Sequence, residues 1–250
     1  MFRWLLVGSF ILLATQMAVA DDFRSLLEKR AIKYADGILL YRLMKPENYD
    51  PKTQYPLVIF LHGMGERGDD NDKQLLHGVA EFAKDENRKK YPCFLMAPQC
   101  PMTTTWADFG NQFKKEPTPA MKLLLEAIST HVKELPIDDK RIYITGLSMG
   151  GFGTWDAIAR KPELFAAAVP ICGGGDVKTA ERIAKIPIWV FHGAKDNAVK
   201  VERSRSMVEA LKKAGGEPKY TEYPDVGHDS WVPAYKDADM FAWLFAQKKK

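Results

Sequence analysis

Apolar runs and amphipathic stretches alternate along most of this chain. After residue 57, short runs of β-branched and aromatic residues predict buried strands, and segments with helical periodicity lie between them. The strands are expected at 57–61, 93–97, 141–145, 166–170, 187–191 and 219–223, and the helices near 73–84, 118–134, 151–160, 201–214 and 233–246. This alternation predicts an α/β fold, with a mostly parallel central sheet and helices on both faces.

The chain before residue 57 has a different pattern. Gly37 to Met44, followed by a proline-rich turn to Pro56, predicts one or two antiparallel strands that lead into the sheet. Residues 21–250 contain no repeat, linker or low-complexity segment, so a single domain with one large core is expected. The longest insertion, Gln99 to Pro119, is expected to line the functional site.

The first 20 residues have the pattern of a secretory signal peptide. Arg3 precedes an apolar run from Trp4 to Ala14, and Ala18-Val19-Ala20 is a small-residue cleavage site. The apolar run is short for a membrane span, and an uncleaved anchor is the alternative. Cleavage after Ala20 predicts a secreted or periplasmic protein with no stable membrane span.

Charge and cysteine content narrow the possible partners. The formal net charge is only +4, and the basic clusters at 88–90 and 248–250 lack interleaved aromatic residues, which argues against a nucleic-acid partner. There is no HExxH or CxxC spacing, so no metal and no cofactor is expected. The three cysteines allow at most one disulfide, and Cys100 and Cys172 could pair or stay free. The oligomeric state is left open by these features.

The segment from Arg141 to Gly151 carries the strongest chemical signal. A strand runs directly into Gly146-Leu147-Ser148-Met149-Gly150, and a helical pattern follows. Strand, G-x-S-x-G and helix form the sequence signature of a nucleophile elbow, in which the serine hydroxyl stands exposed on a tight turn. The bare pattern also occurs by chance, but its context makes Ser148 the candidate nucleophile.

A serine nucleophile needs a base, and the base needs an orienting carboxylate. In chains with a nucleophile elbow, the acid and then the histidine follow the serine. Asp196 lies just after the apolar strand at 187–191, and His228 lies in a turn-rich loop after the strand at 219–223. Ser148, Asp196 and His228 are therefore predicted to form a catalytic triad.

Rival residues for these roles are present in the sequence. Asp176 precedes only a short helix, whereas Asp225 and Asp229 are too close to His228 to occupy a separate loop. Structural roles are expected for the other four histidines, which are His62, His77, His131 and His192.

An oxyanion hole requires two inward-facing donors. The N–H of Met149, directly after the nucleophile, is the first candidate. The second is the N–H of Met64, in the glycine-rich loop after the strand at 57–61, with Gly63 as the alternative. Trp106 and Trp231 are candidates for the substrate pocket, where either could stack on an aromatic or sugar group, and ordinary packing is the alternative for both.

These motifs resemble the α/β-hydrolase superfamily. The chain is similar to secreted esterases grouped with polyhydroxybutyrate depolymerases, feruloyl and acetylxylan esterases, and predicted peptidases. The similar stretches are LVIFLHGMGERGDD, FLMAPQCP, RIYITGLSMGGFGTWDAIARKPELFAAAVPICGGGD, IPIWVFHGAKDNAV and VGHDSW, spread over residues 57–231. The resemblance implies triad roles for Ser148, Asp196 and His228 and oxyanion roles for Met64 and Met149, but it does not single out a substrate.

The resulting hypothesis is a secreted serine hydrolase that cleaves carboxylic esters through an acyl-enzyme. Short or aromatic acyl esters, such as acetyl or feruloyl groups on plant polysaccharide, are the first candidates for a small-molecule or polymer-linked substrate. A serine peptidase of the same fold and a catalytically inactive binding module are the alternatives.

Overall fold

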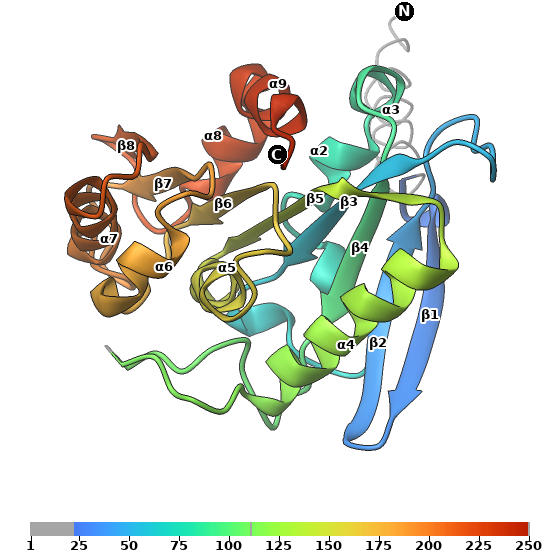
Figure 1. Cartoon of the computed structure of the whole chain (residues 1–250), viewed down its shortest axis with the longest axis horizontal. Helices are drawn as coiled ribbons and strands as arrows, with labels where there is room; N and C mark the ends of the chain where they lie inside the picture. Colours follow the sequence, from blue (N-terminus) through green and yellow to red (C-terminus); the bar gives the residue numbers. More distant parts are fainter. Residues whose placement is uncertain (1–22, 111, 250) are drawn as a thin grey trace, which may run out of the picture.

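The computed structural model describes residues 23–110 and 112–249, and the predicted signal peptide lies outside these residues. Within them, the strands form one sheet in the order β1-β2-β4-β3-β5-β6-β7-β8 (Figure 1). The strands are β1 (Leu27–Tyr34), β2 (Gly37–Met44), β3 (Tyr55–Leu61), β4 (Phe94–Gln99), β5 (Ile137–Leu147), β6 (Ala167–Ile171), β7 (Trp189–Gly193) and β8 (Lys219–Tyr223). β1 and β2 are antiparallel to their neighbours, and the other pairs are parallel.

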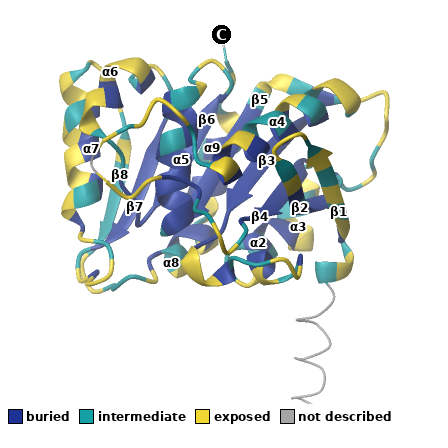
Figure 2. Ribbon diagram, turned by 90° about the horizontal axis from the view of Figure 1, so that it is seen from below, coloured by how far each residue is buried: buried dark blue, intermediate teal, exposed yellow. Residues whose placement is uncertain are grey.

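Helices cover both faces of this sheet (Figures 1 and 2). One face packs against α4 (Pro119–Glu134), α5 (Met149–Arg160), α6 (Ala180–Ile183) and α7 (Glu202–Lys213). The other face packs against α2 (Val79–Ala83), α8 (Trp231–Lys236) and α9 (Ala238–Ala246), and α3 (Asp85–Lys90) follows α2. The predicted α/β fold is confirmed.

The central strand β3 shows why its sequence predicts burial on both faces. Leu57, Ile59 and Leu61 belong to one apolar cluster, whereas Val58 and Phe60 belong to the other. Successive side chains of a strand point to opposite faces, so a strand covered by helices on both sides needs a continuous apolar run. The alternating LEKRAIKY pattern of the edge strand β1 is far more polar, and the sequence prediction did not specify this strand.

Two predicted helices are interrupted in the structure. The helix expected near 73–84 breaks at Gly78, which has a φ of +76°, and a side chain there would collide with the Tyr235 ring. A short 3-10 helix, η2 (Lys73–Leu75), therefore precedes α2. The helix expected near 233–246 breaks at Asp237, whose carboxylate caps the N–H groups of Asp239 and Met240 and starts α9.

Pairing between β6 and β7 is the shortest in the sheet. The ladder joins Ile171 to Phe191, and an isolated bridge joins Ala168 to Ile188. By contrast, β3 and β5 are paired in parallel up to Leu61 and Gly146, at the edge where the site forms.

The three cysteines are free and buried. Cys100 follows β4 and Cys172 follows β6, and the strands β3 and β5 lie between β4 and β6 in the sheet. The pairing considered for Cys100 and Cys172 is therefore absent. Among the helices in the described part of the chain, none is both long enough and apolar enough to cross a membrane.

Candidate active site

Ser148 stands on a strained turn between β5 and α5. Its backbone has φ 53° and ψ −116°, a conformation that non-glycine residues rarely adopt. A Cβ at Gly146 would lie 2.4 Å from the Gly150 carbonyl oxygen, and a Cβ at Gly150 would lie 1.9 Å from the Leu61 carbonyl oxygen. The two glycines of the G-x-S-x-G motif are thus required because three segments of backbone meet here.

The structure brings Ser148, His228 and Asp196 together from three loops. His228 Nε2 lies 2.9 Å from Ser148 Oγ, and His228 Nδ1 lies 2.7 Å from Asp196 Oδ2. Each loop follows the carboxyl end of a parallel strand, namely β5, β7 and β8. These distances suit proton transfer from the hydroxyl to the imidazole, with the carboxylate orienting the ring.

Asp196 is buried, yet its carboxylate is held in the ionised form. Burial by itself raises the pKa of Asp196, but the hydrogen bond with His228 and those from the N–H groups of Val199 and Ala198 together lower it below the ordinary value. These N–H groups donate to Oδ1 over 2.9 and 2.8 Å. The anion is therefore available to steady a positive charge on His228.

His192 is a second neighbour of this carboxylate that the sequence did not predict. Its Nε2 lies 3.2 Å from Asp196 Oδ2 and donates to the Val199 carbonyl over 2.9 Å. Its Nδ1 lies 2.7 Å from Ser204 Oγ. Burial lowers the pKa of His192, so the ring stays neutral and supports the loop that carries Asp196.

The rival aspartates have other partners or lie in solvent. Asp176 Oδ2 accepts a hydrogen bond from the N–H of Phe113 over 2.8 Å. Asp225 forms an exposed ion pair with Lys195, and Asp229 is exposed. Asp196 is thus the predicted acid that reaches the His228 imidazole.

Met149 and Met64, the predicted oxyanion donors, each begin a helix close to Ser148 in the chain or in space. Met149 is the first residue of α5, and Met64 is the first residue of the 3-10 helix η1 (Met64–Glu66). The first N–H groups of a helix have no acceptor within it. A Cβ at Gly63 would lie only 3.7 Å from Ser148 Cβ, so the glycine-rich loop directly adjoins the serine.

His62 fixes this loop in place. Its Nδ1 donates to the Gly63 carbonyl over 2.6 Å, and its Nε2 accepts from the Cys100 N–H over 2.9 Å. This arrangement requires a neutral ring with the proton on Nδ1. Burial lowers the pKa of His62 to about 4. The structural role predicted for His62 thus links the loop after β3 to the loop after β4.

The burial of neutral His62 should make stability depend on pH. Because its pKa is about 4 when folded and about 6.5 when unfolded, protonation favours the unfolded chain. We expect this residue to remove about 1.4 kcal/mol from the free energy of unfolding per pH unit as pH falls through that window. Urea unfolding at several pH values measures this dependence. The free energy of unfolding of His62→Gln should fall less steeply with decreasing pH than that of wild type. An equally steep fall in both proteins would contradict the assignment.

The two tryptophans predicted for the pocket lie in different environments. Trp231 is partly exposed, and its ring meets the His228 ring edge to face, with centroids 5.3 Å apart. Trp106 is fully buried, and its Nε1 donates to the His62 carbonyl over 3.2 Å. The prediction that Trp106 stacks on a substrate is therefore corrected, because the side chain has no accessible face. Trp106 supports the glycine-rich loop after β3 instead.

The Cys172 side chain contacts the turn that carries Ser148. Its Sγ accepts a hydrogen bond from the Ser148 N–H over 3.2 Å, and one ligand atom each from Cys172, Asp196 and His228 lie within 4.8 Å of one another. Burial raises the pKa of the Cys172 thiol to about 12. Both His228 nitrogens are engaged by Asp196 and Ser148, so neither is free for a metal ion in this arrangement. The arrangement fits a packing role for the sulfur better than a metal centre.

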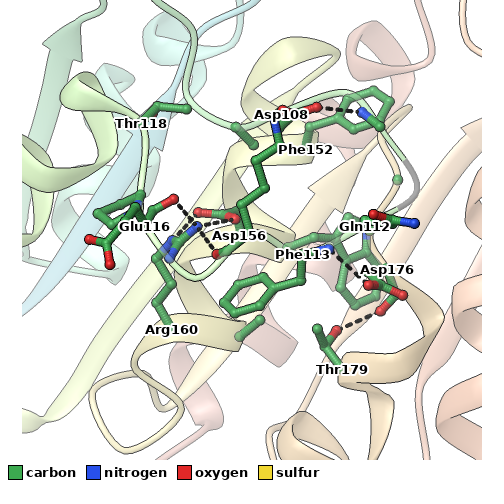
Figure 3. Close-up of a pocket in the computed structure, with 18 residues that line it drawn as sticks. Asp108, Gln112, Phe113, Glu116, Thr118, Phe152, Asp156, Arg160, Asp176 and Thr179 are labelled. Atoms are coloured by element: carbon green, nitrogen blue, oxygen red, sulfur yellow. Dashed lines mark hydrogen bonds and ion pairs between the residues drawn. The ribbon is translucent and has the colours of Figure 1, made fainter.

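The insertion from Gln99 to Pro119 lines a hollow beside α5 (Figure 3). Phe152, one turn after Ser148, contributes to its wall. Arg160 bonds to Asp156 over 2.5 and 3.1 Å and also donates to backbone carbonyls of the insertion. The insertion is thereby anchored to the helix that follows the nucleophile.

The chain is similar to known proteins in both sequence and structure. The family model for phospholipases and carboxylesterases matches residues 48–243. The crystal structure of a thermostable esterase is 42% identical with a TM-score of 0.85, and the match covers 91% of this chain and 64% of that chain.

Curated relatives are more distant. An uncharacterized secreted protein of Arthroderma benhamiae is 24% identical, over 82% of this chain and 25% of that protein. A probable feruloyl esterase C of Aspergillus terreus is 29% identical, over 54% of this chain and 46% of that protein. The chain thus spans less than half the length of both relatives.

Proposed function

Because this chain belongs to the phospholipase/carboxylesterase family, we propose that it cleaves carboxylic esters through an acyl-enzyme intermediate on Ser148. Membership agrees with the α/β-hydrolase resemblance found in the sequence. The observation that carries the proposal is the continuous hydrogen-bonded path from Ser148 Oγ through His228 to Asp196, beside the N–H groups of Met64 and Met149.

In the proposed acylation step, Ser148 Oγ attacks the ester carbonyl carbon while His228 Nε2 takes the hydroxyl proton. The carbonyl oxygen becomes an oxyanion, which the N–H groups of Met64 and Met149 stabilise. Collapse of this intermediate breaks the bond to the alcohol oxygen, and His228 returns the proton to that leaving group. Asp196 keeps Nδ1 protonated and steadies the imidazolium.

Deacylation repeats the sequence with water as the nucleophile. His228 takes a proton from water, hydroxide adds to the acyl carbon, and Ser148 leaves with the proton returned by His228. The release of a carboxylic acid regenerates the free serine. These steps use side chains and backbone groups of the chain, and no metal or cofactor is assigned a role.

Acetyl or feruloyl esters, free or attached to a polysaccharide, are the proposed substrates. The relationship to a probable feruloyl esterase supports an aromatic acyl group, and the relationship to a secreted protein supports export. An exported enzyme would meet polymeric esters outside the cytoplasm, consistent with the predicted signal peptide.

The test uses purified protein spanning residues 21–250. We expect turnover of p-nitrophenyl acetate and methyl ferulate, slower or no cleavage of peptides, and labelling of Ser148 by a fluorophosphonate probe, located by mass spectrometry. A folded protein that takes no label would be a binding module rather than a hydrolase. Faster cleavage of peptides than of esters would instead identify a peptidase.

A further inference from the structure

Glu66 places a carboxylate beside the nucleophile. A methyl group at Gly63 would lie 2.9 Å from Glu66 Oε2 and 3.7 Å from Ser148 Cβ, so both side chains adjoin the Gly63 Cα. Within the described residues, no hydrogen-bond donor reaches the Glu66 carboxylate. The His77 imidazole is a neighbour of this carboxylate, with its Nε2 3.7 Å from Oε1, beyond hydrogen-bond distance.

Side chains of Gln99 and Arg67 anchor the backbone of the loop that carries Glu66. Gln99 Nε2 donates to the Glu66 carbonyl over 3.1 Å, and Arg67 donates to the carbonyls of Met64 and Met102. The Glu66 side chain retains only 11% of its exposure. Because no donor of the described residues occupies this carboxylate, its oxygens are free to accept a hydrogen bond from a ligand.

A continuous wall connects Glu66 to the catalytic histidine. The Trp231 ring lies 5.3 Å from the His228 ring, and the His77 ring lies 5.5 Å from the Trp231 ring, measured between centroids. His77 then borders Glu66. Because His228 must deliver its proton to the leaving alcohol oxygen, the alcohol part of an ester lies on the His228 side of the site. The wall therefore flanks the leaving group.

We propose that Glu66 determines specificity for the alcohol part of the ester by accepting a hydrogen bond from one of its hydroxyl groups. The substrate class is then an ester of a polyhydroxy alcohol, such as an acylated sugar unit, with its ring against Trp231. This inference rests on the proposed esterase function.

The experiment compares two acetates that share the acyl group and a six-membered ring. One is a monoacetylated xyloside with free hydroxyl groups, and the other is cyclohexyl acetate, which has none. Glu66→Met should lower kcat/KM for the xyloside roughly tenfold to a hundredfold, the effect of losing a charged hydrogen bond. Its kcat/KM for cyclohexyl acetate should stay within about threefold of wild type. Glu66→Gln, whose amide oxygen still accepts, should show an intermediate loss.

Asp69→Asn is the matched control, because it removes an exposed carboxylate from the same loop and should leave the ratio between the two substrates unchanged. Equal losses on both acetates in Glu66→Met would overturn the proposal, since they would assign Glu66 to support of the oxyanion loop. Unchanged activity on both, or a loss confined to a cationic ester such as acetylcholine, would also overturn it. Failure of the proposed esterase function can be distinguished from failure of the Glu66 proposal, because the wild-type protein would then hydrolyse neither acetate.

Discussion

Ser148→Ala should remove nearly all ester hydrolysis while leaving the protein folded. The substitution deletes the atom proposed to form the acyl-enzyme, whereas the Met64 and Met149 N–H groups, the proposed oxyanion donors, stay in place. A fall in kcat of several orders of magnitude is expected, to the residual rate that binding and the oxyanion hole sustain alone. Steady-state kinetics with p-nitrophenyl acetate would measure it.

The change in volume is one hydroxyl group, so circular dichroism and the melting temperature should remain close to those of wild type. Ser129→Ala, on the exposed surface of α4, is the matched control and should keep full activity. If folded Ser148→Ala retains most of its activity and still reacts with a fluorophosphonate, another residue is the nucleophile.

Asp196→Asn should lower kcat nearly as much as Ser148→Ala does. The reason lies in the hydrogen bonds that the Asp196 carboxylate accepts. Oδ1 accepts from the N–H groups of Ala198 and Val199, so the asparagine oxygen is expected to keep that position. Its amide nitrogen would then face His228 Nδ1, which must accept rather than donate. That tautomer carries its proton on Nε2 and cannot take one from Ser148, so kcat should fall by roughly 10⁴-fold.

Two other aspartates provide controls for this variant. Asp225→Asn breaks only an exposed ion pair with Lys195, and Asp176→Asn affects the contact with Phe113 in the insertion. Both should keep most of the kcat measured with p-nitrophenyl acetate. A larger loss in either of them than in Asp196→Asn would contradict the assignment of the acid.

The sequence alone predicted that Ser148, Asp196 and His228 lie at one edge of the sheet. Each residue follows a parallel strand, and the carboxyl ends of parallel strands lie at the same edge. Their roles stay predictions. Local patterns could not show that Trp106 is buried, since the His62 carbonyl that it contacts belongs to the loop after β3, 44 residues away in the sequence. Nor could helical periodicity reveal the break at Gly78, which depends on the ring of Tyr235, far along the chain.

The position of Glu66 beside Ser148 could not be predicted from the sequence either. In sequence it is one charged residue in a polar, glycine-rich loop, where a solvated side chain is the ordinary expectation. Its seclusion arises because Gly63 and Leu147 bring the elbow against that loop. Proximity of this kind depends on how two loops pack, which neither loop specifies alone.

The short pairing of β6 with β7 divides the proposed catalytic residues between two parts of the sheet. Ser148 and the glycine-rich loop follow strands of the long β3–β5 ladder, whereas Asp196 and His228 follow β7 and β8, beyond the short ladder. Fewer ladder bonds make that junction the natural place for the sheet to open locally. Heating would then separate Asp196 and His228 from Ser148 while the turn that carries Ser148 stays folded. The upper working temperature of the enzyme would be set by opening of the β6–β7 junction rather than by melting of the core.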